Sequence, residues 1–478
     1  MHLQPGNRMH ANDIALIGLA VMGQNLALNM ARNGQTVTVY NRTWEKTETF
    51  LAGPALGSGI IGARDVLACV ASLKKPRRIF LMVKAGQAVD DLLDSLAPLL
   101  EPGDMVMDGG NSHFEDTEAR LQRMAIRDID YLGVGVSGGE HGALLGPSIM
   151  AGGPIRAWKQ CAPLLKAIAA KAEDGSACAG YMGGGGAGHF VKMVHNGIEY
   201  AVMQLLSELH DLLLRGLHVC PEDQQTLFSA WNSGPAASYL LDITAEILGT
   251  QDLNTGAPLL DSIRDKAGAK GTGVWTSQSA LTLGVAVPTI TAAVDARMMS
   301  GLWAQRQQAA AVLSGPAADA PPFHPQQLGQ ALHSATLMAY AQGFALLQAA
   351  EFAWNWGLAP AEIARVWRAG CIIRANFLDT LARAFEQSPP LPHLLLADSL
   401  RQPLTMGQDS LRATVRLAAG LGIPTPALSA SLAYYDTLRS ARLPANLLQA
   451  QRDYFGAHGF ERLDQPGTFH GPWEKSQR

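Results

Sequence analysis

The stretch IALIGLAVMG, residues 14–23, predicts how the first part of this chain folds. Its four leading apolar residues form a short strand that ends at Gly18, and a helical pattern follows from about Met22 to Asn33. Residues 36–40 then alternate in polarity, as in a second strand. A strand, a tight turn, a helix and another strand are typical of a parallel sheet covered by helices.

The rest of the chain divides into three parts. Further buried strands at residues 78–83 and 104–108 extend the first pattern, so residues 1–182 predict a mostly parallel, doubly wound sheet. The glycine run 183–186 then favours a flexible turn and a domain junction. Apolar residues at three- and four-residue spacing predict an all-helical domain over residues 183–443, and residues 444–478 form an extended C-terminal tail.

Composition narrows the class of protein. Of the 478 residues, 47% are hydrophobic and 16% charged, which excludes a disordered chain. The net charge of −4 gives no global indication of nucleic-acid binding. Five scattered cysteines with no Cys-x-x-Cys pair argue against a disulfide framework and a zinc site, so we expect a cytoplasmic protein without a metal.

Membrane and export segments are not expected. The first twelve residues lack the apolar core of a signal peptide. The longest uncharged stretch, residues 271–294, is interrupted by Gly284 and Pro288, which favours a buried segment of a soluble protein over a membrane span.

The turn after the first strand is a candidate dinucleotide site. Backbone N–H groups between Gly18 and Gly23 can receive a pyrophosphate at a helix N-terminus, although Ala20 replaces the middle glycine of the usual pattern. The second strand ends in Asn41-Arg42-Thr43, where an NAD enzyme carries a carboxylate for the ribose hydroxyl. Arginine pairs with a 2′-phosphate, so we expect NADP. A tight turn without a ligand and a solvated arginine are the alternatives.

A second candidate site lies at residues 188–200. If this segment is helical, Lys192, His195, Asn196 and Glu199 share one face, because they stand at positions i, i+3, i+4 and i+7. Lys192 and Glu199 are then about 10 Å apart along the axis, at ~1.5 Å per residue, which is room for a small polyol acid. The pattern alone is equally compatible with a solvated helix face.

Six motifs in order along the chain resemble those of decarboxylating 6-phosphogluconate dehydrogenases. They cover nearly the whole sequence, and they are GLAVMG (18–23), DGGNS (108–112), GVSGGE (135–140), KMVHNGIEY (192–200), KGTG (270–273) and QRDYFGAH (451–458). The resemblance implies a Rossmann-type domain, a large helical domain and a tail that reaches the partner subunit of a homodimer with a shared site. It also implies the oxidative pentose phosphate pathway, with 6-phosphogluconate as substrate.

The resemblance implies a role for each residue of the two sites. Lys192 is the general base that takes the C3 hydroxyl proton and then acts as an acid, and Glu199 protonates C1 after CO₂ is lost. The implied substrate ligands are Asn111, Ser137, Gly138, Gly139, His195, Asn196, Tyr200, Lys270, Thr272 and Arg297, with Arg452 and His458 from the second subunit. The implied cofactor ligands are Gly18, Ala20, Met22, Gly23, Asn41, Arg42, Thr43, Val83, Lys84, Ala85 and Asn111.

Some features depart from the family pattern, and two other functions remain open. The glycine run 183–186 is unusual, Val274 stands where a lysine is common, and an extension precedes the first strand, so that Met9 is an alternative start.

One alternative function is a related β-hydroxyacid dehydrogenase acting on a shorter acid, which would not need Lys270 and Arg297 as phosphate ligands. The other alternative is an inactive NADP-binding scaffold, which would not need Lys192 and Glu199 as a base and an acid on one helix face.

Overall fold

A computed structural model describes residues 11–268, 271–317, 320–387 and 390–473. Its main sheet has eight strands in the order β3-β2-β1-β4-β5-β6-β7-β8. All neighbouring pairs are parallel except β6 and β7, so β7 and β8 run opposite to the other six. The strands are β1 (Ile14–Ile17), β2 (Val37–Tyr40), β3 (Ile61–Gly62), β4 (Arg78–Leu81), β5 (Met105–Asp108), β6 (Asp130–Ser137), β7 (Ser148–Gly152) and β8 (Ala179–Gly183).

Helices cover both faces of the sheet because β1 is apolar at every position. Ile14 and Leu16 belong to one core, Ala15 and Ile17 to the other, as expected when side chains alternate across a strand. The first core is closed by α1 (Val21–Arg32), α2 (Trp44–Ala52) and α7 (Ile155–Ile168), and the second by α3 (Val66–Ala71), α4 (Gln87–Leu96) and α5 (Phe114–Ala125). The short helix α6 (Gly139–Leu145) follows β6. The predicted doubly wound sheet is confirmed.

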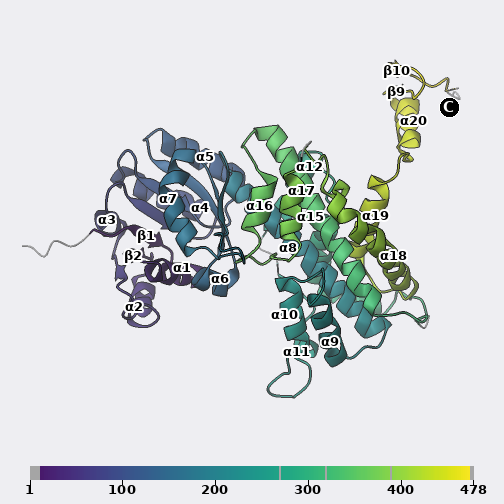
Figure 1. Ribbon diagram of the computed structural model, residues 1–478, viewed down its shortest axis with the longest axis horizontal. Coiled ribbons are helices and arrows are strands. Elements are labelled where there is room, and N and C mark those ends of the chain that lie inside the picture. The colour runs from purple at the N-terminus through teal and green to yellow at the C-terminus, as the bar shows by residue number, and fades with distance from the viewer. Residues whose placement is uncertain (1–10, 269–270, 318–319, 388–389, 474–478) are drawn as a thin grey trace, which may run out of the picture. The chain divides into compact units, whose positions relative to one another are not determined.

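From residue 187 to 438 the described chain is helical, also as predicted (Figure 1). Helix α8 (Ala187–Asp211) is central, since it packs against β6 and β7 on one side and against α12, α13 and α15 on the other. The remaining helices are α9 (Pro221–Asn232), α10 (Tyr239–Leu248), α11 (Leu259–Ser262), α12 (Thr272–Thr282), α13 (Pro288–Gly301), α14 (Trp303–Ala310), α15 (Gln326–Trp354), α16 (Pro360–Val366), α17 (Leu378–Phe385), α18 (Asp398–Gly420) and α19 (Pro426–Leu438).

The glycine run before α8 is tightly packed, which corrects the expectation of a flexible turn. Gly184 donates its N–H to the carbonyl oxygen of Trp356 at 2.7 Å, and Gly186 donates to Glu118 Oε1 at 2.7 Å. A Cβ on Gly186 would lie 2.6 Å from the carbonyl oxygen of Phe114. The run therefore serves close approach of the helical part to the sheet.

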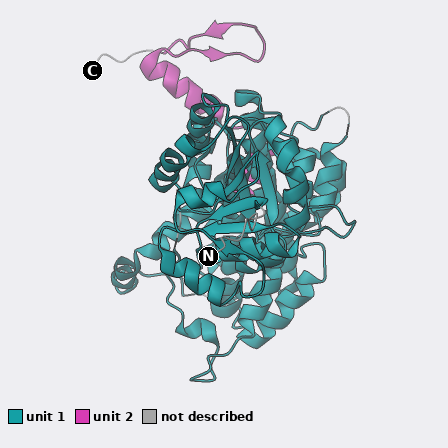
Figure 2. Ribbon diagram, turned by 90° about the vertical axis from the view of Figure 1, so that its left-hand side faces the viewer, with its two compact units in different colours: residues 1–431 teal, residues 432–478 magenta. Residues whose placement is uncertain are grey.

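The chain separates into two compact units, residues 1–431 and 432–478 (Figure 2). The second unit contains α20 (Ala445–Gly456) and the antiparallel pair β9 (Phe460–Glu461) and β10 (Thr468–Phe469). Buried Asp453 organises it by accepting hydrogen bonds from the backbone of Gly459 and Gly471 and from the side chains of His470 and Trp473. The domain boundaries predicted at residues 182/183 and 443/444 stay predictions.

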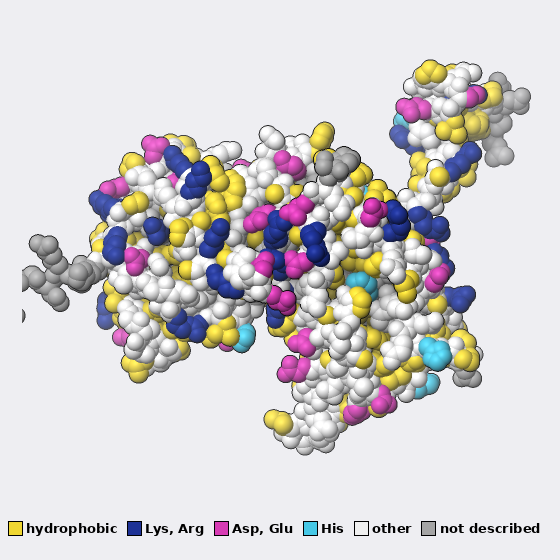
Figure 3. All heavy atoms as spheres, viewed as in Figure 1, with side chains coloured by type: hydrophobic (Ala, Val, Ile, Leu, Met, Phe, Trp, Pro, Cys, Tyr) yellow, Lys and Arg dark blue, Asp and Glu magenta, His cyan; other side chains and the backbone are white. Residues whose placement is uncertain are grey.

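No helix within the described ranges is both long and apolar enough to cross a membrane. Figure 3 shows a face of the molecule on which acidic and basic side chains are interspersed, most densely near the middle. The proposed alternative start, Met9, lies outside the described residues.

Candidate active site

A cavity of about 410 Å³ lies where β1, β2 and β4 end. Seven of the predicted cofactor ligands line it, namely Gly18, Ala20, Asn41, Arg42, Thr43, Val83 and Lys84. Met22, Gly23, Ala85 and Asn111 are not among the lining residues. Lys46, in the first turn of α2, adds a cation beside Arg42 that the sequence analysis missed. One acidic side chain, Asp91 of α4, also lines the cavity.

The glycine turn after β1 packs closely against the end of β4. Gly18 has φ +104°, and a Cβ there would lie 2.5 Å from the carbonyl oxygen of Met82. Asn41 Oδ1 accepts the N–H of Leu19 at 3.1 Å, and Asn41 Nδ2 donates to the carbonyl oxygen of Thr43 at 3.0 Å. Asn41 therefore stabilises the turn, and its predicted role as a cofactor ligand stays a prediction.

The residues of the cavity fit NADP better than NAD. Arg42 and Thr43 follow the end of β2, where a carboxylate would repel a 2′-phosphate. The helix α1 begins at Val21, so its unpaired N–H groups face the cavity end of β1.

The predicted catalytic face lies on helix α8, where Lys192, His195 and Asn196 are buried and Glu199 is half-buried. Lys192 is 7% exposed and its Nζ donates to Asn196 Oδ1 at 2.7 Å, while His195 Nδ1 is 3.3 Å away. His195 Nδ1 also lies 3.1 Å from Asn196 Oδ1 and 3.7 Å from Glu199 Oε2. Lys192, His195 and Asn196 thus lie within hydrogen-bond distance of one another, and Glu199 lies one turn further along the same face.

Strand β6 makes room for this face through its alternation of small residues. A Cβ on Gly133 would lie 2.8 Å from the Nδ1 of His189, and one on Gly135 would lie 2.5 Å from the Cβ of Lys192. Two residues further on, Ser137 Oγ lies 3.0 Å from His195 Nε2. Positions i, i+2 and i+4 of β6 therefore face three successive polar side chains of α8.

Burial brings the ionisable groups of the face towards their neutral forms. Burial lowers the pKa of Lys192, and the nearby carboxylate of Glu199 opposes that shift. Burial raises the pKa of Glu199, against the charges of Lys192 and Arg297. The pKa of His195 falls well below its ordinary value through burial and the charge of Lys192, so its imidazole is neutral near pH 7. Burial therefore favours the neutral amine of Lys192 and the protonated carboxyl of Glu199 on the same helix.

The loop after β6 joins the sheet to the helical part. Gly138 and Gly139 have positive φ, and a Cβ on Gly138 would collide with the carbonyl oxygen of Gly370. Ser137 Oγ accepts the N–H of Ile372 at 3.4 Å. These predicted substrate ligands lie at the junction of the two parts of the first unit.

The predicted phosphate ligands of the first unit only partly come together. The guanidinium of Arg297, on α13, lies 3.7 Å from the ring centroid of Tyr200 on α8. A Cβ on Gly273 would lie 2.6 Å from that ring, so the start of α12, at Thr272, approaches it closely. Val274 packs in the same apolar cluster as Tyr200. Lys270 lies outside the described residues.

Arg452 and His458 lie in the second unit. Arg452 donates to Gln449 Oε1 at 3.1 Å, and His458 lines a cavity of about 660 Å³ within that unit. Asn111 is exposed and lies in the loop after β5.

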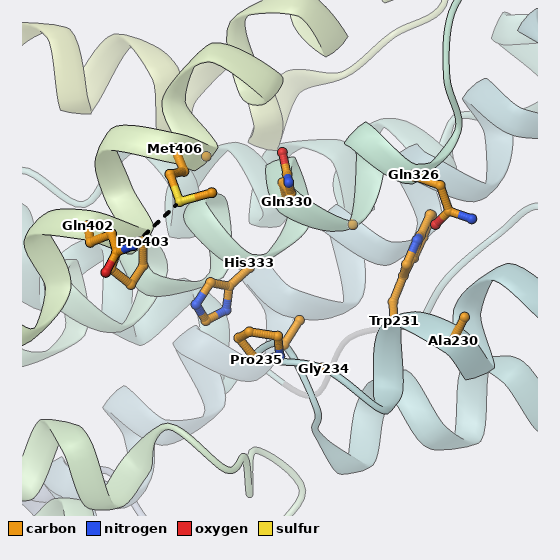
Figure 4. A pocket seen from close by; sticks show the side chains of 13 residues that line it. Ala230, Trp231, Gly234, Pro235, Gln326, Gln330, His333, Gln402, Pro403 and Met406 are labelled. Carbon is orange, nitrogen blue, oxygen red and sulfur yellow. Dashed lines mark hydrogen bonds between the residues drawn. The ribbon is translucent and has the colours of Figure 1, made fainter.

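The described residues were also expected to hold no metal ion, and they contain a further cavity. Within those ranges no group of three or more His, Cys, Asp and Glu side chains could hold a metal ion. A cavity of about 390 Å³ between α9, α15 and α18 is lined by Trp231, His333 and Met406 among others (Figure 4). It contains none of the predicted site residues and lies apart from α8.

Comparison with known proteins identifies the family. Residues 13–183 match the NAD binding domain of 6-phosphogluconate dehydrogenase, and residues 188–473 match the 6-phosphogluconate dehydrogenase C-terminal domain. The chain belongs to the 6-phosphogluconate dehydrogenase family. The resemblance carried by the six motifs is thereby confirmed.

Relatives within the 6-phosphogluconate dehydrogenase family match almost end to end. The 6-phosphogluconate dehydrogenase, decarboxylating, of Synechococcus elongatus is 50% identical, covering 97% of this chain and 100% of that protein. The NADP(+)-dependent, decarboxylating enzyme of Bacillus subtilis is 48% identical, covering 98% and 100%. A solved Plasmodium falciparum 6-phosphogluconate dehydrogenase, described with its cofactor NADP+ and its substrate 6-phosphogluconate, is 41% identical with a TM-score of 0.92, covering 96% and 100%.

Proposed function

We propose that this chain catalyses the oxidative decarboxylation of 6-phosphogluconate to ribulose 5-phosphate and CO₂ with NADP. The observation that carries the proposal is the face of α8 where Lys192 and Glu199 stand at the two ends of one row of polar side chains. The near full-length similarity to decarboxylating enzymes supports it. We also propose a cytoplasmic location, in line with the five free cysteines.

NADP supplies the hydride acceptor when it is bound. Arg42 and Lys46 would hold the 2′-phosphate, and the N–H groups at the start of α1 would hold the pyrophosphate. Val83 and Lys84 line the same cavity after β4. The remaining predicted ligands, Met22, Gly23, Ala85 and Asn111, stay part of the proposal.

Lys192 is proposed as the base for the C3 hydroxyl proton. Burial lowers its pKa, which raises the fraction that is neutral and able to take a proton. Asn196 Oδ1, 2.7 Å from Nζ, orients the amine. Oxidation at C3 places a ketone β to the carboxylate. As CO₂ leaves, the electrons of the broken carbon–carbon bond move towards the C3 carbonyl, and the protonated Lys192 stabilises the resulting enolate.

Glu199 is proposed as the proton donor to C1. Burial raises its pKa, which favours the protonated carboxyl that a proton donor needs. His195 lies between the two groups, with Ser137 and Asn196 as hydrogen-bond partners. Ser137, Gly138, Gly139, His195 and Asn196 are proposed to bind the carboxylate and hydroxyls of the substrate.

A dianionic phosphate needs a cluster of cations and donors. We propose Tyr200, Lys270, Thr272 and Arg297 for this role, together with Arg452 and His458 of a second copy in a homodimer.

Exposed apolar side chains at the end of α13 and the start of α14 support the association of two copies of the chain. They are Met298, Met299, Leu302 and Trp303.

One assay separates this function from the two alternatives. Purified protein is given 6-phosphogluconate with NADP or NAD, while reduced cofactor and CO₂ are followed together. We expect equal yields of both products and a preference for NADP. Cofactor reduction without CO₂ would favour the β-hydroxyacid dehydrogenase. No reaction with either cofactor would favour the inactive scaffold.

A further inference from the structure

A buried histidine outside the proposed catalytic set connects the sheet to helix α8. His189 is 2% exposed and precedes Lys192 by one turn. Its Nε2 lies 3.0 Å from the carbonyl oxygen of Asp108, the last residue of β5. Its Nδ1 lies 2.6 Å from Thr117 Oγ1 on α5. One imidazole ring therefore ties three elements together.

The hydrogen bonds of His189 define its tautomer. A carbonyl oxygen only accepts, so Nε2 carries the proton that is donated to Asp108. Burial lowers the pKa of His189, against the charge of Asp108, and the neutral ring leaves Nδ1 free to accept the hydroxyl proton of Thr117. Nothing larger than hydrogen fits on Gly133, because a Cβ there would lie 2.8 Å from Nδ1.

Asp108 holds the loop that carries Asn111 from both sides. Its Oδ1 accepts the N–H of Gly110 at 3.0 Å, and its Oδ2 accepts the hydroxyl of Ser112 at 2.6 Å. Tyr131 also donates to Oδ2 at 3.0 Å, and the guanidinium of Arg120 lies 3.7 Å from it. Gly110 and Ser112, on either side of Asn111, are thus held by the side chain of Asp108. The backbone carbonyl of Asp108 accepts the hydrogen bond from His189.

We propose that His189 is a positioning residue that fixes the distance between the Asn111 loop and Lys192. The inference rests on the proposed function, in which Asn111 contacts cofactor and substrate and Lys192 takes the proton. Hydride transfer needs reacting atoms about 3–3.5 Å apart, and a 1 Å displacement costs about 100-fold in rate. A rigid link between the loop and the helix meets that need without touching the substrate.

The test uses two matched pairs of variants in the full-length protein. His189→Leu removes both hydrogen bonds, whereas the amide of His189→Gln can donate and accept in their place. Thr117→Val removes the hydroxyl, whereas Thr117→Ser keeps it. We measure kcat, KM for 6-phosphogluconate, the Kd of NADP, Tm, and the isotope effect with substrate deuterated at C3.

We expect His189→Leu to lower kcat about 10- to 100-fold with an increased isotope effect and a Kd of NADP within about threefold of wild type. His189→Gln and Thr117→Ser should recover most of the rate. A kcat within about twofold of wild type in folded His189→Leu would overturn the proposal. If that variant does not fold, equal kcat values for Thr117→Val and Thr117→Ser would do so. An inactive wild-type protein would instead contradict the proposed function.

Discussion

Two of the buried ionisable groups on helix α8, Lys192 and Glu208, have different surroundings. Lys192 Nζ meets side chains, with Asn196 Oδ1 at 2.7 Å. Glu208 accepts the backbone N–H groups of Ala427 and Leu428, at 2.8 and 2.9 Å, where α19 begins. A side chain can rotate and give its place to a substrate, whereas the backbone of a packed helix cannot. The surroundings of Lys192 therefore suit a catalytic group, whereas those of Glu208 suit a group that holds α8 and α19 together.

Burial shifts both groups towards neutrality, so the pKa direction alone does not distinguish them. It lowers the pKa of Lys192 and raises that of Glu208 to about 7. What differs is the partner: a helix N-terminus satisfies Glu208, and a neighbouring amide orients Lys192. Changing each group should therefore affect a different property of the protein.

The largest expected effect is that of Lys192→Met on turnover. Removing a general base costs about 10²- to 10⁴-fold, and the apolar replacement avoids burying an ammonium group, so we expect loss of kcat with little loss of stability. Steady-state rates and fluorescence titration with NADP check this, with the Kd of NADP expected near wild type. Equal losses of turnover and NADP affinity would mean that Lys192 is not the base.

Gly135→Ala tests whether β6 sets the position of Lys192. The added Cβ would lie 2.5 Å from the Cβ of Lys192 and 3.0 Å from the carbonyl oxygen of Gly188, so α8 must move away from the strand. We expect kcat/KM to fall about 100-fold. Gly420→Ala, at the open end of α18, is the matched control and should leave kcat/KM unchanged. Indistinguishable kinetics for the two variants would show that β6 does not set the position of Lys192.

Ser137→Ala tests the hydrogen bonding of His195 with a smaller change. It removes the hydroxyl 3.0 Å from His195 Nε2 and leaves that buried nitrogen without this partner. Such a loss costs about 1–3 kcal/mol, and we expect about a tenfold fall in kcat/KM. Ser233→Ala, on the exposed end of α9, serves as the control. An unchanged kcat/KM in Ser137→Ala would show that His195 needs no support from β6.

Glu208→Gln should have the smallest effect on turnover and a distinct effect on stability. Because the pKa of Glu208 is raised to about 7, the folded protein holds its proton more tightly than the unfolded chain, with a pKa of about 4.3. This contribution is complete below about pH 4.3 and is lost as the pH rises through 7. The Tm advantage of wild type over the variant should therefore shrink between pH 5 and 8, as thermal denaturation can measure. A constant or growing advantage would contradict the raised pKa.

Local patterns predicted the parts of the site that depend on neighbours in sequence. The strand–glycine–helix order predicted the turn at Gly18, and three- and four-residue spacing placed Lys192 and Glu199 on one face. Lys46, which lines the cofactor cavity, was missed because a lysine in a helix's first turn has no distinctive local signal. The alternating Gly133, Gly135 and Ser137 were a visible signal for β6, since small residues at period two leave room on one face.

The sequence by itself determined the doubly wound sheet, the helical part and the family, because each depends on periodicity or on contiguous motifs. Only the tertiary structure decided that the glycine run packs against Trp356 and Glu118, that Gly135 admits Lys192, and that His189 joins β5 to α8. These contacts join residues 57 to 172 positions apart, and no local pattern specifies which distant side chain fills a given space. Burial follows from the same packing, and it shifts the pKa values of Lys192 and Glu199.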